Sequence, residues 1–518
     1  MLDSWPVENR YVPFLQNLHL LLEGTPHARA TIKNTAMLRI IVGLGAVTVL
    51  TAILLFLGKR SARRLQRARR IRIDRFKLKS QHADIELEVF GHREVVQAIQ
   101  RYARENHVST EQATKVAKTY LREIVPKFNL LAYYRFGAPI ARAIMHFLYR
   151  PVVERTPIRD FNQVAAKGTV VVYVINHRSN ADYVLVAHML FKFISLSYAV
   201  GEWARVWPLN HLFKWFGAYF IRRRYREPLY HAVLSSFVQT ITSNGVTQGI
   251  FLEGGLTRDG AFQKPKLGML DYIVGSKRDP QFDSLLVLMP TAINYDRVLE
   301  DRNLTEELLG KEDRSTKVEK LNTTLEFLFK NTMRSFLKRF KRYGYAIVTF
   351  GTPIIVDDFI REHPSILADA FEERKPALTE LAEKVLEEIS NVLPLTPVTL
   401  VARVFTKVDS CSDEEMASAL DAERKAFADR VWLTREHNGA EIWRSARDIL
   451  ELRHLVEERE GRWRWNPEEH MLRDYYANSL LTFEEVKQRG WPERKRDEPT
   501  VAAVKQATAV VSPNGTSS

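Results

Sequence analysis

Cysteine is almost absent from this chain, because Cys411 is the single thiol among 518 residues. One cysteine cannot form an internal disulfide or supply a cysteine-rich zinc or iron–sulfur site, and it suits a reducing compartment. Internal repeats are also absent, which argues against a solenoid or a propeller. A composition of 45% hydrophobic and 27% charged residues excludes wholesale disorder. The length allows two or three domains around a large core.

The positive charge is concentrated in one place. The formal net charge is +14, and residues 59–79 contain 11 Lys or Arg against one acid, Asp74. That run carries +10, so the remaining chain carries only +4. An excess confined to one short run does not describe a basic nucleic-acid-binding domain, and we expect no nucleic-acid partner.

The most apolar stretch directly precedes this basic run. Residues 40–58 contain no charge, and a 19-residue helix approaches the ~30 Å thickness of bilayer hydrocarbon. We predict a single transmembrane helix at 37–58, although a buried soluble helix or a cleaved signal peptide is an alternative reading. The positive-inside rule places the basic run and the bulk of the chain on the cytoplasmic side of the cell membrane, which in a bacterium is the inner membrane. The basic run should also contact anionic membrane lipids.

The residues from about 169 to 350 alternate between β-rich and helical patterns. A dense β-branched run at 169–175 suits a strand buried on both faces, and a helix is expected at Pro228–Ser243. Further strands are expected at 194–200, 249–252, 285–292 and 345–350. Strands that alternate with helices predict an α/β sheet.

Helical patterns occupy the flanking regions on both sides of this sheet. The predicted segments are an N-terminal segment 1–36, the membrane helix 37–58, a basic segment 59–80, a helical region 81–160, a catalytic domain 161–395, a C-terminal helical region 396–499 and a disordered tail 500–518.

A histidine and an aspartate follow the 169–175 strand in the sequence NHRSNAD. His177 leaves the carboxyl end of a predicted buried strand, which is the usual position of an α/β active site. Asp182 falls about one turn into the next helix, for which Asn180 is a plausible N-cap, and it can accept the Nδ1 proton of His177. That contact would leave Nε2 as a base for a substrate hydroxyl. Taken alone, the pair is equally well read as a hydrogen-bonded loop histidine.

Two clusters of arginine and glycine come next along the chain. One is GAYFIRRR at 217–224, and the other is EGGLTRDG at 253–260, directly after a predicted strand. Glycines let backbone N–H groups approach an anion, and arginine binds phosphate oxygens in bidentate fashion. Each cluster by itself could be a solvated face. A base and two phosphate-binding clusters at strand ends together indicate a site for a phosphorylated substrate.

These blocks resemble the four ordered motifs of the glycerolipid acyltransferases with an H-x4-D motif. NHRSNADYVL, GAYFIRR, FLEGGLTR and VLMP occur in the family's order, and the continuations PKLGML and INYDRVLE are more similar to the glycerol-3-phosphate and dihydroxyacetone-phosphate acyltransferases than to the lysophosphatidate enzymes. The resemblance covers residues 88–405. It implies an acyltransferase domain with a mixed sheet flanked by helices.

The resemblance also implies roles for individual residues. His177 would be the general base and Asp182 would orient it. The residues that would bind substrate are Arg222, Arg223, Glu253, Gly254, Gly255, Arg258 and, on the acyl-donor side, Pro290. The family usually has a second arginine where this chain has Leu256, which leaves the acceptor's identity open.

The implied activity is membrane-bound O-acyl transfer from an acyl thioester, carried by coenzyme A or acyl carrier protein, to a hydroxyl of glycerol 3-phosphate. This is the first step of phospholipid synthesis. Dihydroxyacetone phosphate and a lysophospholipid are alternative acceptors, and no cofactor or metal is expected because the transfer is downhill. A hydrolase would need a nucleophile such as Ser179, but the sequence has no G-x-S-x-G elbow. A non-enzymatic tether or a nucleic-acid protein would explain only the basic run.

Overall fold

The computed structural model describes residues 82–126, 137–154, 160–161, 168–190, 197–200, 219–222, 225–308 and 342–491. The predicted membrane helix, the basic segment and the tail lie outside these residues. Within the described ranges, no helix is both long and apolar enough to cross a bilayer. The membrane helix at 37–58 therefore stays a prediction.

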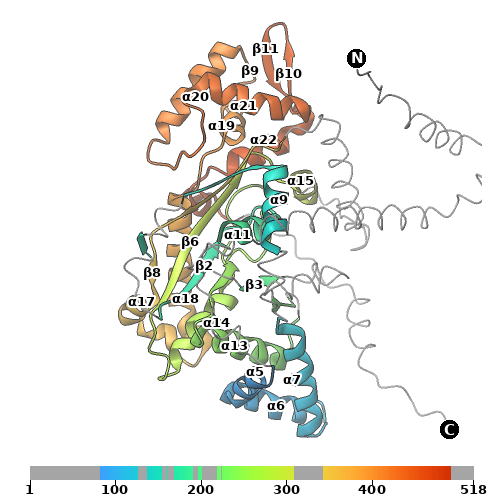
Figure 1. Ribbon diagram of the computed structural model, residues 1–518, viewed down its shortest axis with the longest axis vertical. Coiled ribbons are helices and arrows are strands. Elements are labelled where there is room, and N and C mark those ends of the chain that lie inside the picture. Colours follow the sequence, from blue (N-terminus) through green and yellow to red (C-terminus); the bar gives the residue numbers. More distant parts are fainter. Residues whose placement is uncertain are drawn as a thin grey trace, which may run out of the picture.

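A mixed eight-stranded sheet forms the centre of the molecule, which confirms the α/β class (Figure 1). Its strand order is β1-β7-β6-β2-β5-β3-β4, with β8 paired to β6. Strand β6 runs antiparallel to β7 and β8, and the other pairs are parallel. The strands are β1 (Arg150–Val153), β2 (Val170–Ile175), β3 (Ser197–Val200), β4 (Tyr219–Phe220), β5 (Gln248–Phe251), β6 (Leu286–Tyr295), β7 (Tyr345–Phe350) and β8 (Ile354–Ile355).

Strand β2 is buried on both faces, as its unbroken β-branched sequence predicts. Successive side chains of a strand point to opposite faces, so Val171, Tyr173 and Ile175 join one hydrophobic core. Val170, Val172 and Val174 join a second core on the other side. The strand that precedes His177 is therefore fixed by packing from two directions.

Helices cover both faces of the sheet (Figure 1). Beside the first core lie α9 (Ala138–Leu148), α11 (Asp182–Leu190), α15 (Asp301–Leu308), α19 (Pro397–Phe405), α20 (Asp413–Ala426), α21 (Gly439–Leu452) and α22 (His470–Asn478). The second core includes α5 (His82–Gly91), α6 (Arg93–Glu105), α7 (Thr110–Ile124), α13 (Pro228–Ser243), α14 (Leu267–Gly275), α17 (Val356–Glu362), α18 (Phe371–Asn391) and α23 (Phe483–Arg489). Helix α13 has the predicted bounds, because Pro228 starts it and the Glu227 side chain caps it.

Strand β6 is longer than the predicted strand at 285–292. The strand continues through Pro290 to Tyr295. Its antiparallel neighbour changes here, because Val287 and Leu288 pair with β8 whereas residues from Thr291 onward pair with β7. A proline, which lacks an N–H, is tolerated at this junction between two ladders.

Two regions predicted to be helical also contain strands. Residues 150–153 form β1 at the sheet edge, and the C-terminal region holds a three-stranded sheet. That sheet consists of β9 (Ser410–Cys411), β10 (Val456–Arg459) and β11 (Arg462–Trp465). Trp463 and Trp465 of β11 are buried and pack in the first core, so tertiary packing decides their structure.

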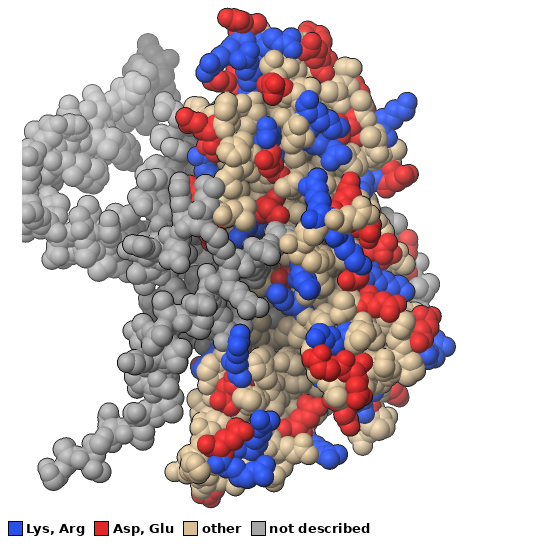
Figure 2. Space-filling model, turned by 180° about the vertical axis from the view of Figure 1, so that it is seen from behind, with Lys and Arg blue, Asp and Glu red and all other residues tan. Residues whose placement is uncertain are grey.

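Charges of both signs are interspersed over the described surface seen in Figure 2. This agrees with the small net charge left once the basic run at 59–79 is set aside.

Candidate active site

The carboxyl end of β2 is tied to its neighbour β6 by one side chain. Asn176 donates from Nδ2 to the carbonyl of Ile293 at 3.0 Å and accepts the N–H of Ile293 at 2.7 Å. This paired contact continues the sheet one residue past the end of β2. His177 therefore leaves the sheet from a fixed backbone position.

Asp182 holds the imidazole of His177, as the sequence predicts. The Nδ1 of His177 lies 3.0 Å from Oδ2 of Asp182, and Asp182 is fully buried. The backbone N–H groups of Arg178 and Ser179 donate to the same oxygen at 2.8 and 3.0 Å. Because Oδ2 already accepts from two N–H groups, Nδ1 must carry the histidine's proton. The lone pair is then on Nε2, as a general base requires. Helix α11 begins at Asp182 itself, two residues after the predicted N-cap Asn180, so Asp182 lies at the start of the helix and not one turn into it.

Tyr295 binds the second oxygen of Asp182. Its hydroxyl donates to Oδ1 at 2.6 Å from the end of β6. Burial, reinforced by the charge of Asp182, raises the pKa of Tyr295 well above its ordinary value, so the phenol stays protonated. Sequence reasoning missed this residue, because its partner is 113 positions away. A tyrosine at the end of the strand next to the histidine-bearing strand is the signal that could have found it.

Aromatic rings orient the imidazole. The ring of His177 stacks on Phe251 of β5 with centroids 4.0 Å apart, and Tyr183 of α11 approaches edge-on at 5.6 Å. His177 is 1% exposed, so its ring is packed and does not face open solvent. Its orientation is thus set by both a hydrogen bond and ring contacts.

Two glutamates, the buried Glu253 and the half-buried Glu300, hold the turn from 177 to 182. Glu253 accepts the N–H of His177 at 2.9 Å and that of Gln263 at 2.8 Å. Glu300 accepts the hydroxyl of Ser179 at 2.7 Å and the N–H of Asn180 at 3.3 Å. Burial raises the pKa of each carboxyl to about 7. Glu253, predicted to contact substrate, uses both oxygens to position the loop, and Glu300 is an additional positioning residue.

Arg178 connects this turn to the C-terminal region. It is 2% exposed, and its guanidinium donates to the carbonyls of Gly260 and Ser479. It also lies over the Phe262 ring at 5.6 Å. A buried arginine at this position shows that α22 and the loop after it support the histidine turn, which consists of residues 177–182.

Two of the three arginines predicted to bind substrate form ion pairs with glutamate. Arg222 contacts Glu123 of α7 through Nε at 3.0 Å and Nη2 at 2.8 Å. Arg258 contacts Glu307 of α15 through Nε at 2.6 Å. Arg223 lies outside the described residues. Both pairs are partly exposed. A phosphate would therefore have to displace or join a carboxylate at either arginine.

Arg222 lies farther from the histidine than Arg258 does. Strand β4 is three strands from β2, which at about 4.8 Å per strand amounts to ~14 Å. Its guanidinium lies over the Tyr225 ring at 4.7 Å. Arg258 belongs to the loop whose Thr257 donates its N–H to the carbonyl of His177 at 3.2 Å. The structure brings Arg258 toward the histidine turn and leaves Arg222 beside α7.

The remaining predicted residues have mainly backbone roles. Gly254 adopts a φ of +67°, and a Cβ there would fall 2.7 Å from Cγ of Lys266. Gly255 is buried beside it. The carbonyl of Pro290 accepts the N–H of Gly351 at 2.9 Å, within the central strand. Contact of Pro290 with an acyl donor stays a prediction. In the part of the chain described here, no group of three or more His, Cys, Asp or Glu side chains is arranged to hold a metal ion.

Comparison with known proteins supports the same family. Residues 157–282 match the acyltransferase family, and residues 328–483 match the glycerol-3-phosphate acyltransferase C-terminal region. A glycerol-3-phosphate acyltransferase of Aeromonas hydrophila is 29% identical over 60% of this chain and 37% of its own length. That of Alteromonas mediterranea is 27% identical over 64% of this chain and 40% of its own length.

A solved structure, a 1-acyl-sn-glycerophosphate acyltransferase from Thermotoga maritima, is 16% identical over 59% of this chain and 86% of its own, with a TM-score of 0.27. The chain spans about two fifths of the length of the two curated relatives, and both matched regions contribute to the turn that holds His177. With its H-x4-D pair at the end of a buried strand, the chain carries an acyltransferase domain followed by a region similar to the C-terminal region of glycerol-3-phosphate acyltransferases.

Proposed function

We propose that this chain is an O-acyltransferase that moves an acyl group from an acyl thioester to a hydroxyl of glycerol 3-phosphate. The observation that carries the proposal is the contact of His177 Nδ1 with a buried Asp182 that has three further donors. This arrangement leaves Nε2 of His177 unprotonated. We choose glycerol 3-phosphate as the acceptor because the similar proteins are named glycerol-3-phosphate acyltransferases.

The reaction needs one base and no covalent enzyme intermediate. His177 Nε2 takes the proton of the acceptor hydroxyl while that oxygen attacks the thioester carbonyl. A tetrahedral intermediate forms, the carbon–sulfur bond breaks, and the imidazolium returns the proton to the departing thiolate. Asp182 stabilises the imidazolium in between, and Tyr295 and the turn's N–H groups hold Asp182 in place.

The contacts of Ser179 argue against a hydrolase with this serine as nucleophile. Its hydroxyl donates to Glu300 at 2.7 Å, and its oxygen accepts the N–H of Ala181 at 3.0 Å. A serine nucleophile instead needs its hydroxyl hydrogen-bonded to the base. The geometry favours transfer to a substrate hydroxyl.

We extend the proposal to the membrane and to the substrates. Residues 37–58 would anchor the chain with its catalytic part on the cytoplasmic side, and the basic residues that follow would contact anionic lipids. Coenzyme A or acyl carrier protein would carry the acyl group. The anchored chain should stay with membranes through high salt and alkaline extraction. Release by salt alone would indicate a protein held by surface charge, which salt screens within ~10 Å at 0.1 M.

The deciding experiment offers acceptors in turn to the purified full chain with a labelled acyl thioester. Glycerol 3-phosphate, dihydroxyacetone phosphate and a lysophospholipid are compared, and products are identified by mass. We expect the acylated glycerol 3-phosphate to dominate. The exposed His470 provides a control, because His470→Ala should retain activity that His177→Ala loses. Absence of product with all three acceptors would refute the proposal.

A further inference from the structure

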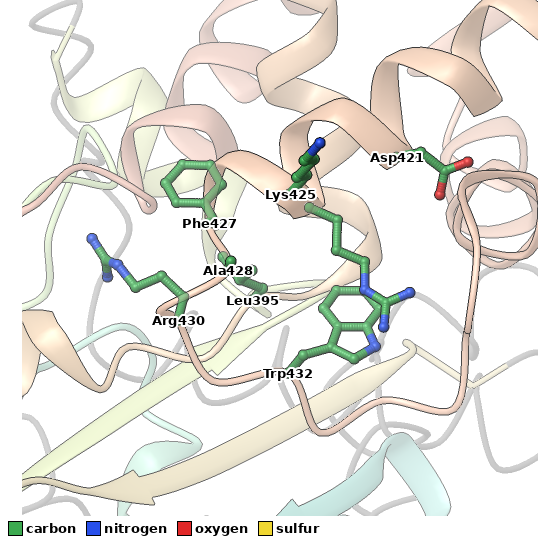
Figure 3. Close-up of a pocket in the computed structure, with 8 residues that line it drawn as sticks. Leu395, Asp421, Lys425, Phe427, Ala428, Arg430 and Trp432 are labelled. Carbon is green, nitrogen blue, oxygen red and sulfur yellow. The ribbon is translucent and has the colours of Figure 1, made fainter.

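A hollow of about 380 Å³ lies in the C-terminal region, apart from the residues around His177. Its walls come from the end of α20 and from the segment that leads toward α21. Figure 3 shows Leu395 and Ala428 between Arg430 on one side and Trp432 on the other. The volume falls in the range of about 300–1,000 Å³ that is usual for small-molecule sites.

Cations outnumber acids around this hollow. Arg424, Lys425 and Arg430 line it together with one acid, Asp421. The carboxylate of Asp421 accepts the N–H of Gly439 at 2.7 Å, so one of its oxygens is already occupied. The lining therefore carries a net charge of +2, from three positive groups and one negative group.

Neutral oxygen atoms hold both arginines of the hollow. Arg424 donates to the carbonyl of His437, and its guanidinium lies 5.1 Å from the centre of the Trp432 ring. Arg430 donates from Nη1 to the carbonyl of Ser390 at 2.5 Å. Within the described part of the chain, neither arginine nor Lys425 forms an ion pair with a carboxylate. Burial lowers the pKa of Arg430. The nearby carboxylate of Glu485 opposes this effect, and the positive charge of Arg403 adds to it.

Several other buried or partly buried arginines of the molecule pair with acids, although Arg178 is held by carbonyl groups. Arg374 pairs with Asp271 at 2.6 Å, and Arg453 pairs with Asp301 at 2.7 Å. Arg403, close to the hollow, pairs with Glu423 at 3.0 Å. Removing charge from water is costly unless an opposite charge is supplied. The hollow thus has positive charge that the chain itself does not balance.

We infer that this hollow is a second anion site, which binds a phosphate monoester group. A phosphate at neutral pH carries about −1.5 to −2 charges and three acceptor oxygens, which matches the excess charge and the number of cations. Arginine and lysine are the usual partners of phosphate. The guanidiniums are already oriented by carbonyl and ring contacts, so little ordering is needed on binding.

Lys425 permits a direct test by covalent labelling. Pyridoxal 5'-phosphate, an aldehyde that bears a phosphate monoester, forms an imine with an amine that borohydride reduction makes permanent. The full chain is treated with this reagent or with 5'-deoxypyridoxal, which lacks both the phosphate and the 5'-hydroxyl that would close onto the aldehyde, and labelled lysines are mapped by peptide mass. We expect pyridoxal 5'-phosphate to label Lys425 about tenfold faster, the factor that one charge-assisted contact contributes. The exposed Lys115 of α7 is the internal control and should show no such preference.

Two variants distinguish a phosphate-binding site at Lys425 from a surface lysine that is merely reactive. Arg430→Gln should abolish the phosphate preference at Lys425 without unfolding the chain. Arg444→Gln, which removes an exposed positive charge from α21, should leave it intact. Equal labelling of Lys425 by both aldehydes, or a preference that survives Arg430→Gln, would overturn the inference.

Protection experiments identify where the phosphate comes from. Inorganic phosphate or glycerol 3-phosphate that slows labelling of Lys425 indicates a soluble ligand. Protection only by vesicles of phosphatidate in phosphatidylcholine, and not by phosphatidylcholine alone, indicates a lipid headgroup. If neither protects, the hollow is not a phosphate site. Mapping by peptide keeps this result independent of the proposed activity, which involves none of these residues.

Discussion

The histidine turn and the phosphate-binding arginines proposed to serve it are built differently. Around His177 every carboxylate oxygen of the buried Asp182 and Glu253 and of the half-buried Glu300 accepts a hydrogen bond from a fixed donor. Arg222 and Arg258 are partly exposed, and each is held by a single glutamate. The first arrangement is preorganised, as catalysis requires. The second can exchange partners, as binding and release of a substrate require.

Removing the base should give the largest effect. His177→Ala should lower kcat by at least roughly 10²–10⁴-fold, because proton removal from the acceptor is lost. The substitution also removes a ring that stacks on Phe251, so thermal unfolding must be measured alongside steady-state kinetics. A folded variant with near-normal kcat would contradict the mechanism.

The half-buried Glu300 should make stability depend on pH, because its carboxyl is largely removed from water. Burial raises its pKa from 4.5 to about 7. As pH rises, the unfolded chain therefore releases this proton at a lower pH than the folded chain does. The free energy of unfolding falls as pH rises from about 4.5 to 7. Glu300→Gln cannot ionise and should remove up to about 3 kcal/mol of that fall. Its amide can accept from Asn180 and donate to Ser179, so the turn is kept.

Urea unfolding between pH 5 and 8 measures this difference. Glu306→Gln, on the exposed side of α15, is the matched control and should follow the wild-type curve. Parallel curves for wild type and Glu300→Gln would mean that Glu300 ionises normally in the folded state.

Asp182→Asn should be milder than loss of the base. The amide oxygen can take the place of Oδ2 and keep its contacts with the backbone N–H groups and with Nδ1. The amide nitrogen then faces the hydroxyl of Tyr295, which can accept. The tautomer is kept and only the negative charge is lost. We expect kcat to fall about 10–100-fold, the usual value of a hydrogen bond to a charged group. A loss as large as that of His177→Ala would show that the tautomer had changed.

Arg258 should affect acceptor binding more than donor binding. Arg258→Ala should raise the KM for glycerol 3-phosphate by about tenfold, because a charge-assisted contact is lost. Initial rates with each substrate varied separately give both values. A change confined to the KM of the acyl thioester would assign this loop to the donor.

The smallest effect should come from the glutamate that now holds Arg258. Glu307→Gln should lower the acceptor KM by up to about fivefold, because exposed ion pairs contribute at most ~1 kcal/mol. A rise in KM would show that Glu307 positions the arginine and does not compete with phosphate. That outcome would make the two regions alike and remove the contrast between them.

Local patterns predicted the elements that carry the catalytic pair. The β-branched run before His177 fixes β2, and Pro228 fixes the start of α13. Contacts between distant residues could not be predicted in this way. Tyr295 and Asp182 are 113 positions apart, and Arg222 and Glu123 are 99 apart. Tertiary packing has no local signal, so these partners appear only in the fold.

Short strands were missed for a related reason. Strand β9 has two residues, and β11 alternates arginine and tryptophan in a charged sequence. Pairing between Trp463 and Cys411 stabilises them across about fifty residues. The passage of β6 through Pro290 likewise depends on where β7 and β8 end.

The close approach of α22 to the loop after β5 affects how the chain can be divided. Gly260 has a φ of +83°, and a Cβ there would fall 1.8 Å from the carbonyl oxygen of Tyr475. Asn478 donates to the carbonyl of Asp259 at 3.0 Å, beside the contact of Arg178 with Ser479. The two segments matched by separate families therefore pack directly on each other. A chain cut near residue 395 would leave the buried guanidinium of Arg178 without one of its partners, so removal of the C-terminal region should also disturb the turn that holds His177.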